Sequence, residues 1–317
     1  MVSLVYLCVD IGGTKISSGL SDGKTVWQTA TQPVAKGIVP LLHQLHQIYA
    51  TYATDPTFPL SAVCIGCPGN IIDHHIAPGS AQNLGTFPGE FDHFNLRQAL
   101  EDLPIPVYIF NDATAQMAGG YALLHNTLAG VDRIGYIGPG TGLGGGFSKV
   151  DETGINTGLQ PVTDGHIFDI LLPQRRGGSK GVRPASLRIA EDLLSGRAFF
   201  AQTGQFARDA GKTPEKYQPL MVEWGQTLAL LIRTLHQGPL RKPATAPPWS
   251  ADEIAFVQTV DHYLIGGGMG TAHPFGDWMI QSARNTLATW QLPITLHRIP
   301  DVGVAGLLGV GILGGSK

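Results

Sequence analysis

Residues 4–15 read Leu4-Val5-Tyr6-Leu7-Cys8-Val9-Asp10-Ile11-Gly12-Gly13-Thr14-Lys15, an apolar run followed by a carboxylate, two glycines and a hydroxyl. The apolar run predicts a buried β-strand. Glycine permits the positive φ angles and the close backbone approach that a phosphate-binding loop requires. The spacing matches neither the P-loop pattern nor G-x-G-x-x-G. The stretch therefore predicts a phosphate-binding loop of another α/β fold.

The composition favours a globular protein that acts on small molecules. The chain has 317 residues, which is long enough for two domains. Glycine contributes 42 residues, about 13%, against a usual ~7%, whereas charged residues make up only 14%. The formal net charge of −3 gives no support to a nucleic-acid partner or to an anionic membrane.

The cysteines indicate a reducing compartment. Cys8, Cys64 and Cys67 are too few and odd in number for a disulfide scaffold. The Cys64–Cys67 pair is formally C-x-x-C, but a zinc site needs about four ligands and no second pair exists, so we interpret it as a buried strand end. Without a signal peptide or a long apolar run, we expect a cytoplasmic protein with no membrane contact.

Apolar periodicity and turn residues predict an alternation of strands and helices. Strands are expected at Val5–Val9, Lys15–Ser21, Thr25–Thr31, Leu60–Ile65, Pro106–Phe110, Arg133–Ile137, Phe147–Val150 and His262–Ile265. Helices are expected at Ile38–Tyr52, Leu96–Leu103 (capped by Asn95), Ala113–Ala122, Ala185–Leu194, Met221–Gln237, Pro274–Trp290 and Val302–Leu313.

The strand–glycine loop–strand–turn pattern occurs twice. It appears at residues 5–23 and again at residues 133–154, where the glycine loop is Gly138–Gly146. A third glycine loop, Gly266–Gly270, follows a later strand. The repeat predicts two similar β-domains, and three such junctions are more specific than any one of them.

An ordered set of motifs resembles a known family. These are Asp10–Lys15, Phe110-Asn111-Asp112-Ala113-Thr114-Ala115, Gly138–Gly146, Asp164-Gly165-His166 and Ile265–Gly268. The chain is similar to the ROK and bacterial glucokinase group of sugar kinases, in the actin/hexokinase/Hsp70 ATPase superfamily. The resemblance implies a two-lobed α/β, actin-like (ribonuclease H-like) fold with duplicated sheets and an interlobe cleft. The small lobe would comprise residues 1–112, completed by the helix 302–317, and the large lobe residues 113–301.

The residues agree with phosphoryl transfer, which needs placement and charge neutralisation. ATP and Mg²⁺ are the expected cofactors, with Asp10 as an outer-shell Mg²⁺ ligand. Asp112 follows a strand at the edge where α/β folds open their sites, so we expect it to be the general base for the acceptor hydroxyl. The structural alternative for Asn111-Asp112 is a helix N-cap.

The resemblance also assigns binding residues. Those implied for the sugar are Asn83, Asn111, Asp112, His166 and Glu191. Those implied for the nucleotide are Asp10, Gly12, Gly13, Thr14, Lys15, Gly140, Thr141, Gly142, Gly266, Gly267 and Gly268. The alternatives without a binding role are a solvated helix residue for Glu191 and a core histidine for His166.

Two departures from the family pattern bear on function. Thr163 stands where the family has a glutamate three residues before the histidine, which leaves the identity of the sugar open. The family's cysteine-rich zinc loop corresponds to Gln174–Arg183, which contains no cysteine, so we expect no structural zinc.

The leading hypothesis is therefore an ATP-dependent, glucokinase-like hexose kinase. The alternatives are a polyphosphate-dependent glucokinase and a non-catalytic, sugar-responsive regulator of the same family. The chain starts at the first strand, without the helix-turn-helix of such regulators, which disfavours the latter. The sequence leaves open the phosphorylated hydroxyl, the phosphoryl donor and whether the protein forms a homodimer.

Overall fold

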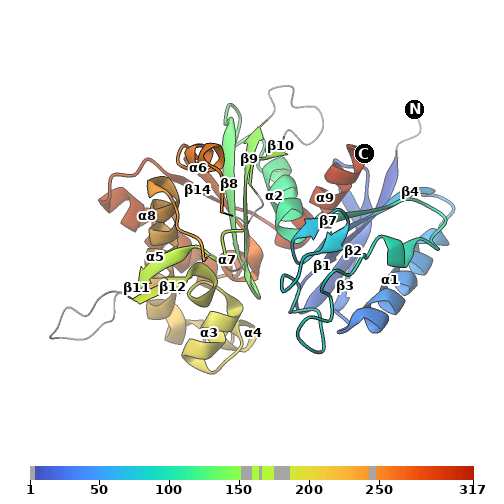
Figure 1. The fold of residues 1–317 in the computed structure, drawn as a ribbon, viewed down its shortest axis with the longest axis horizontal. Coiled ribbons are helices and arrows are strands. Elements are labelled where there is room, and N and C mark those ends of the chain that lie inside the picture. Colours follow the sequence, from blue (N-terminus) through green and yellow to red (C-terminus); the bar gives the residue numbers. More distant parts are fainter. Residues whose placement is uncertain (1–3, 151–158, 164–165, 175–185, 243–247) are drawn as a thin grey trace. The chain divides into compact units, whose positions relative to one another are not determined.

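The chain is an α/β protein with two compact units, each built on a five-stranded β-sheet (Figure 1). The computed structural model describes residues 4–150, 159–163, 166–174, 186–242 and 248–317. The first unit comprises Met1–Ala129, Asp151–Leu159 and Pro300–Lys317, and the second unit comprises Gly130–Val150 and Gln160–Ile299. Helix α2, which starts at the lobe boundary expected at residue 112, lies within the first unit.

The first unit is built on the sheet β3-β2-β1-β4-β7. Its strands are β1 (Val5–Ile11), β2 (Lys15–Ser21), β3 (Val26–Pro33), β4 (Leu60–Cys67), β5 (Ile71–Ile72), β6 (His75–Ile76) and β7 (Val107–Asn111). Its helices are α1 (Ile38–Ala53), α2 (Asp112–Leu123) and α9 (Val302–Gly315). Strand β1 pairs antiparallel with β2 and parallel with β4, which pairs parallel with β7. The carboxyl ends of β1, β4 and β7 therefore share one edge, where α/β proteins bind their ligands.

Both faces of this sheet are covered. Leu7 and Val9 of β1 share a core cluster with Leu41 of α1. Cys8, which points to the opposite face, packs in a second cluster with Leu307 of α9. Figure 1 accordingly shows α1 on one side of the sheet and α2 and α9 on the other. Because both faces are buried, β1 reads as a continuous apolar run instead of an alternating one.

Helices α2 and α9 touch through their backbones. A Cβ atom on Gly119 would lie 1.9 Å from the carbonyl oxygen of Ala305, and one on Gly309 would lie 1.8 Å from that of Ala115. Neither position has space for any side chain, so glycine is needed for this close approach. The glycines of the C-terminal helix therefore hold α2, and with it Asp112, against the sheet.

We expect Gly309→Ala to lower the free energy of unfolding by roughly 1–3 kcal/mol, because the added methyl group meets backbone that cannot move aside. Gly303→Ala in the same helix is the matched control, since its nearest contact is a side-chain oxygen of Asp301 at 3.3 Å. That control should stay within about 1 kcal/mol of the wild type. Urea denaturation measures both, and equal stabilities would contradict the close helix packing.

The second unit repeats the arrangement with the sheet β10-β9-β8-β13-β14. Its strands are β8 (Arg133–Pro139), β9 (Leu143–Val150), β10 (Leu159–Pro161), β11 (Leu171–Gln174), β12 (Ser186–Ile189), β13 (His262–Ile265) and β14 (Thr295–Arg298). Its helices are α3 (Gly196–Thr203), α4 (Ala207–Ala210), α5 (Gln218–Gln237), α6 (Ala251–Val257), α7 (Gly267–Thr271) and α8 (Phe275–Thr289).

The two sheets have the same topology, which confirms the internal repeat. Strand β8 pairs antiparallel with β9 and parallel with β13, and β13 pairs parallel with β14. These are the relations of β1 to β2 and β4, and of β4 to β7. Helices α5 and α8 pack against each other and share the core of the second unit with residues of its sheet, such as Phe147 and Tyr263.

Two predicted helices are wrong. Leu96–Leu103 holds only a 3-10 turn at Gln98–Leu100, whose N-cap position is Arg97, not Asn95. Asn95 Oδ1 does accept a hydrogen bond from the Gln98 N–H at 2.9 Å. The segment Ala185–Leu194 contains strand β12, which pairs antiparallel with β11, and a 3-10 turn. Tertiary pairing outweighs local helix propensity there.

The predicted glycine loops of the second unit are also shorter than expected. Gly138 lies in β8 and Gly145 in β9, so only residues 140–142 form the turn. A Cβ atom on Gly138 would lie 2.2 Å from the Tyr136 hydroxyl, and one on Gly145 would lie 2.3 Å from the Ile167 side chain. These strand glycines make room for neighbouring side chains. Most of the third glycine loop is the short helix α7.

Cys8, Cys64 and Cys67 are buried free thiols, which confirms the interpretation of the C-x-x-C as a buried strand end. Among the described residues, no helix is long and apolar enough to cross a membrane.

Candidate active site

Asp10 stands at the edge of the first sheet where the glycine turn begins. It pairs in register with Gly66 of β4 and Ser17 of β2. The turn that follows is closed by a 2.8 Å hydrogen bond from the Gly12 N–H to the carbonyl oxygen of Lys15. Gly13 and Thr14 therefore form the tip of a tight turn, with Thr14 exposed.

The Asp10 carboxylate is enclosed by glycines. A Cβ atom on Gly306 of α9 would lie 2.3 Å from Asp10 Oδ2, and one on Gly66 would lie 3.4 Å from Oδ1. Oδ1 is buried and accepts no hydrogen bond from the described residues. Burial and, to a smaller extent, the Asp112 charge raise the pKa of Asp10 to about 7, while the Lys15 charge opposes the shift. Asp10 is thus a half-buried carboxylate, one oxygen of which is buried and has no hydrogen-bond partner among the described residues.

Asp112 is the first residue of α2, directly after β7. Its Oδ1 accepts a 2.8 Å hydrogen bond from the Ala113 N–H. Burial raises its pKa to about 6, although the backbone N–H groups of Ala113 and of Asp112 itself oppose the shift. Cys67, at the end of β4, has its pKa raised by burial and by the charges of Asp112 and Asp10. Because β4 lies between β1 and β7 and all three strands are parallel, the two carboxylates stand at the same edge of the sheet.

Asn111 is the N-cap of α2, as the structural alternative anticipated. Its Oδ1 accepts a 3.0 Å hydrogen bond from the Thr114 N–H, and its Nδ2 donates to the Gly69 carbonyl oxygen at 2.8 Å. The cap accounts for Asn111 but not for Asp112, whose second carboxylate oxygen is not needed for capping. The cap instead fixes the start of α2 and so orients Asp112.

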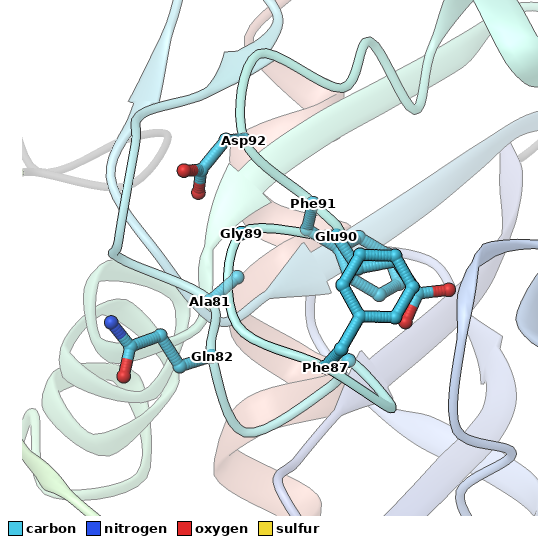
Figure 2. Close-up of a pocket in the computed structure, with 8 residues that line it drawn as sticks. Ala81, Gln82, Phe87, Gly89, Glu90, Phe91 and Asp92 are labelled. Carbon is cyan, nitrogen blue, oxygen red and sulfur yellow. The ribbon is translucent and has the colours of Figure 1, made fainter.

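Asn83 belongs to the loop of residues 81–92 in the same unit. Figure 2 shows other residues of this loop, among them Gln82, Phe87 and Glu90. Its Oδ1 is buried and has no hydrogen-bond partner among the described residues. The depression lined by this loop has no room for a water-sized molecule, so it is not a ligand pocket by itself. An orphaned buried amide oxygen is costly, which makes it a candidate acceptor for a ligand hydroxyl.

Lys36 is a functional candidate that the sequence reasoning missed. Its Nζ donates hydrogen bonds to the carbonyl oxygens of Gly13 and Asn83, each at 2.5 Å. It therefore contacts both the glycine turn and the loop 81–92. The sequence itself shows only a lysine before a glycine. In the structure that glycine, Gly37, has a φ of 91° and is the N-cap of α1.

The residues of this edge suit a Mg²⁺–phosphate ligand. Carboxylate oxygens are the donors that Mg²⁺ prefers, and Asp10 offers one with no other partner. No cluster of three or more metal-ligating side chains occurs in the part of the chain that the structure describes. The expected absence of a structural zinc at Gln174–Arg183 stays a prediction, because residues 175–183 lie outside the described residues.

In the second unit, the structure brings two of the glycine segments together. The Gly140 N–H donates to the carbonyl oxygen of Gly142 at 2.9 Å, which closes the turn around Thr141. A Cβ atom on Gly140 would lie 3.9 Å from the Gly268 nitrogen. Gly267 has a φ of 67°, and a Cβ there would lie 2.3 Å from the Pro139 carbonyl oxygen. Gly267 is thus packed too tightly against Pro139 for a side chain. Gly268 is exposed, and a Cβ atom there would meet no atom of the described residues within 4 Å, so open space at this turn lies beside Gly268.

Glu191 lies against the same turn, which the sequence did not indicate. A Cβ atom on Gly142 would lie 2.5 Å from Glu191 Oε1, and that oxygen pairs with Arg197 Nη2 at 2.7 Å. The Glu191 N–H donates to the Phe168 carbonyl oxygen at 3.0 Å, and the Phe168 ring lies 5.0 Å from that of His166. His166 and Glu191 are thus on adjoining segments, with His166 only 7% exposed.

The remaining predicted residues are less informative. Gly266 caps α7, and its N–H donates to the carbonyl oxygen of Ile137 at 3.0 Å. Asp164 and Gly165 lie outside the described residues.

Comparison with known proteins gives a family and a fold. A sequence model described as the ROK family matches residues 6–222, more than half of the chain. No curated protein matches.

Solved structures match over almost the whole chain. A ROK hexokinase from Thermus thermophilus is 22% identical with a TM-score of 0.63, covering 99% of this chain and 100% of that one. A ROK family glucokinase from Streptomyces griseus, in complex with glucose and AMPPNP, is 20% identical with a TM-score of 0.64 and the same coverage. A ROK family transcriptional regulator, described as a homologue of the Escherichia coli MLC protein, is 14% identical with a TM-score of 0.60, covering 99% and 80%. These likenesses show the actin-like ATPase fold with its duplicated sheets.

Proposed function

Because the chain belongs to the ROK family, we propose that it is a cytoplasmic sugar kinase that transfers the γ-phosphoryl group of ATP to a hexose hydroxyl. The observation that supports this most is the pair Asp10 and Asp112 at the carboxyl edge of the first sheet. Burial holds the pKa of Asp112 at about 6, so near neutral pH it is ionised yet able to accept a proton. A catalytic base works best when its pKa lies near the operating pH.

In this proposal Asp112 is the general base. It accepts the proton of the attacking sugar hydroxyl as the phosphorus–oxygen bond forms, while the bond to the leaving oxygen of ADP breaks. Asn111 caps α2 and so fixes where Asp112 stands. Asn83 Oδ1 accepts a hydrogen bond from another sugar hydroxyl, which satisfies its orphaned oxygen. In the second unit, His166 and Glu191 are the proposed sugar contacts.

The glycine segments are the proposed nucleotide contacts. In the first unit these are Asp10, Gly12, Gly13, Thr14 and Lys15. In the second unit they are Gly140, Thr141, Gly142, Gly266, Gly267 and Gly268. Backbone N–H groups and the threonine hydroxyls donate to phosphate oxygens. Asp10 is the proposed outer-shell ligand of Mg²⁺, which would neutralise phosphate charge when bound.

The test is an activity panel. The purified protein is incubated with ATP and Mg²⁺ and with hexoses, amino sugars or N-acetyl sugars in turn, and ADP formation is measured. Sugar-dependent ADP release with at least one of them is expected. Correctly folded protein that is inactive with every sugar would contradict the kinase proposal.

Two alternatives give different results in the same panel. A polyphosphate-dependent kinase would form sugar phosphate faster with polyphosphate than with ATP. A regulator would bind sugar, seen by calorimetry, without turnover. The regulator among the similar structures and Thr163, in place of the family glutamate, are the observations that favour that second reading.

A further inference from the structure

Lys36 joins the two proposed ligand-binding segments of the first unit. Its Nζ donates to the carbonyl oxygens of Gly13 and Asn83 at 2.5 Å. Gly13 lies at the tip of the proposed phosphate turn, and Asn83 carries the orphaned oxygen proposed to meet the sugar. One side chain therefore spans segments that are far apart in the sequence.

The residues after Lys36 fasten the same loop. The Gly37 N–H donates to the Leu84 carbonyl oxygen at 2.9 Å. Glu90 Oε1 accepts from the Ile38 N–H at 2.9 Å, and Glu90 Oε2 accepts from the N–H and hydroxyl of Thr86 at 2.6 and 2.8 Å. Figure 2 shows Glu90 and Phe87 within this loop. The loop 81–92 is thus tied to the start of α1, so that a shift of one is passed to the other.

The positive charge of the Lys36 ammonium group is stabilised by two backbone carbonyl oxygens. No carboxylate of the described residues lies within ion-pair distance of it, and burial lowers its pKa. Hydrogen bonds from an ammonium group to carbonyl oxygens are stronger than neutral ones. An ammonium group also has three donors, so one remains for a third acceptor.

We propose that Lys36 is a positioning residue that couples nucleotide binding at the turn 12–15 to the conformation of the sugar loop 81–92. This inference rests on the proposed function. Phosphate bound to the N–H groups of the turn limits the motion of the Gly13 carbonyl group. Through its hydrogen bonds to both carbonyl oxygens, Lys36 then limits the motion of Asn83 as well. By thermodynamic reciprocity, a sugar that fixes Asn83 strengthens nucleotide binding by the same factor.

Hydrogen exchange of the full chain, with AMP-PNP and Mg²⁺ as the probe, tests the coupling without knowledge of the sugar. In the wild type, the probe should slow exchange at residues 10–15 and also, by about fivefold or more, at residues 81–92. In Lys36→Met the slowing should stay confined to residues 10–15. A merely structural role for Lys36 would change the exchange of the unliganded loop but not its response to nucleotide.

The matched control is Lys24→Met, since Lys24 is an exposed lysine of the same unit in the turn between β2 and β3. It should behave as the wild type. Lys36→Gln, which is too short to span both carbonyls, should repeat the loss if the methionine variant folds poorly. The proposal is overturned if loop 81–92 still responds in both Lys36 variants, or never responds in a wild type whose turn does. No slowing anywhere in the wild type would contradict the proposed nucleotide site itself.

Discussion

Asp112→Asn is expected to lower turnover by about 10²–10⁴-fold, because the amide cannot take the proton of the acceptor hydroxyl. Sugar binding should survive, since Asn keeps the shape of the side chain and an oxygen that can accept from the Ala113 N–H as Asp112 does. ADP formation measures turnover, and calorimetry with the sugar found by the panel measures binding.

Asp301→Asn is the matched control for this change. Asp301 also stands at the start of a helix of the first unit, where its Oδ1 accepts from the Gly303 and Val304 N–H groups. Asn caps helices as well as Asp does, so turnover should stay near the wild-type value. Near-normal turnover of Asp112→Asn would sink the assignment of the base, whereas loss of turnover in both variants would indicate a general effect of helix-start changes.

Asp10→Asn is expected to stabilise the protein while impairing it as an enzyme. Burial and Asp112 raise the pKa of Asp10 from 3.8 to about 7 in the folded state. The folded protein therefore holds a proton that the unfolded chain releases, and stability falls as the pH rises from about 4 to 7. Removing the charge should raise the free energy of unfolding at pH 8 by roughly 2–4 kcal/mol, and by little at pH 4.

Denaturant titrations of the two proteins across this pH range measure the difference. Added ATP analogue and Mg²⁺ should stabilise the wild type more than Asp10→Asn, because Asp10 no longer offers a carboxylate. Parallel curves of stability against pH for the two proteins would refute a raised pKa at Asp10. Asp22→Asn is a useful comparison, since the pKa of Asp22 is lowered by hydrogen bonds from Thr25 and Lys24 and its removal should not stabilise.

The sheets could be predicted because their strands carry local signals. The glycine turn after β1, the strand ending at Asn111 and the repeat around β8 all follow from short patterns in the sequence. Strand β14 and helix α3 were not predicted. Thr295–Arg298 is only four residues long, and its strand conformation depends on pairing with β13. Helix propensity and periodicity say little about segments that short.

The candidate site could be predicted in its residues but not in its arrangement. Asp10 and Asp112 lie at strand ends, which the sequence shows, but the effect of Asp112 on the pKa of Asp10 depends on the order of the strands, with β4 between β1 and β7. The contact of Gly306 with Asp10 and the reach of Lys36 are tertiary. No local sequence pattern can show that Gly306, near the C-terminal end of the sequence, lies beside Asp10, near its start. Nor can it show which carbonyl oxygens the long Lys36 side chain contacts.

The position of α9 in the first unit has a consequence for the order of synthesis. Strands β1 to β7 and helix α2 are made first, yet the sheet face that carries Cys8 is completed by Leu307 and Val310 near the end of the chain. Residues of the second unit are translated in between. The first unit therefore emerges with an apolar face uncovered, while the second can bury its own core before α9 is made. A ribosome-bound chain of this protein would need protection at that face, and its two carboxylates would reach their final surroundings only with the last helix.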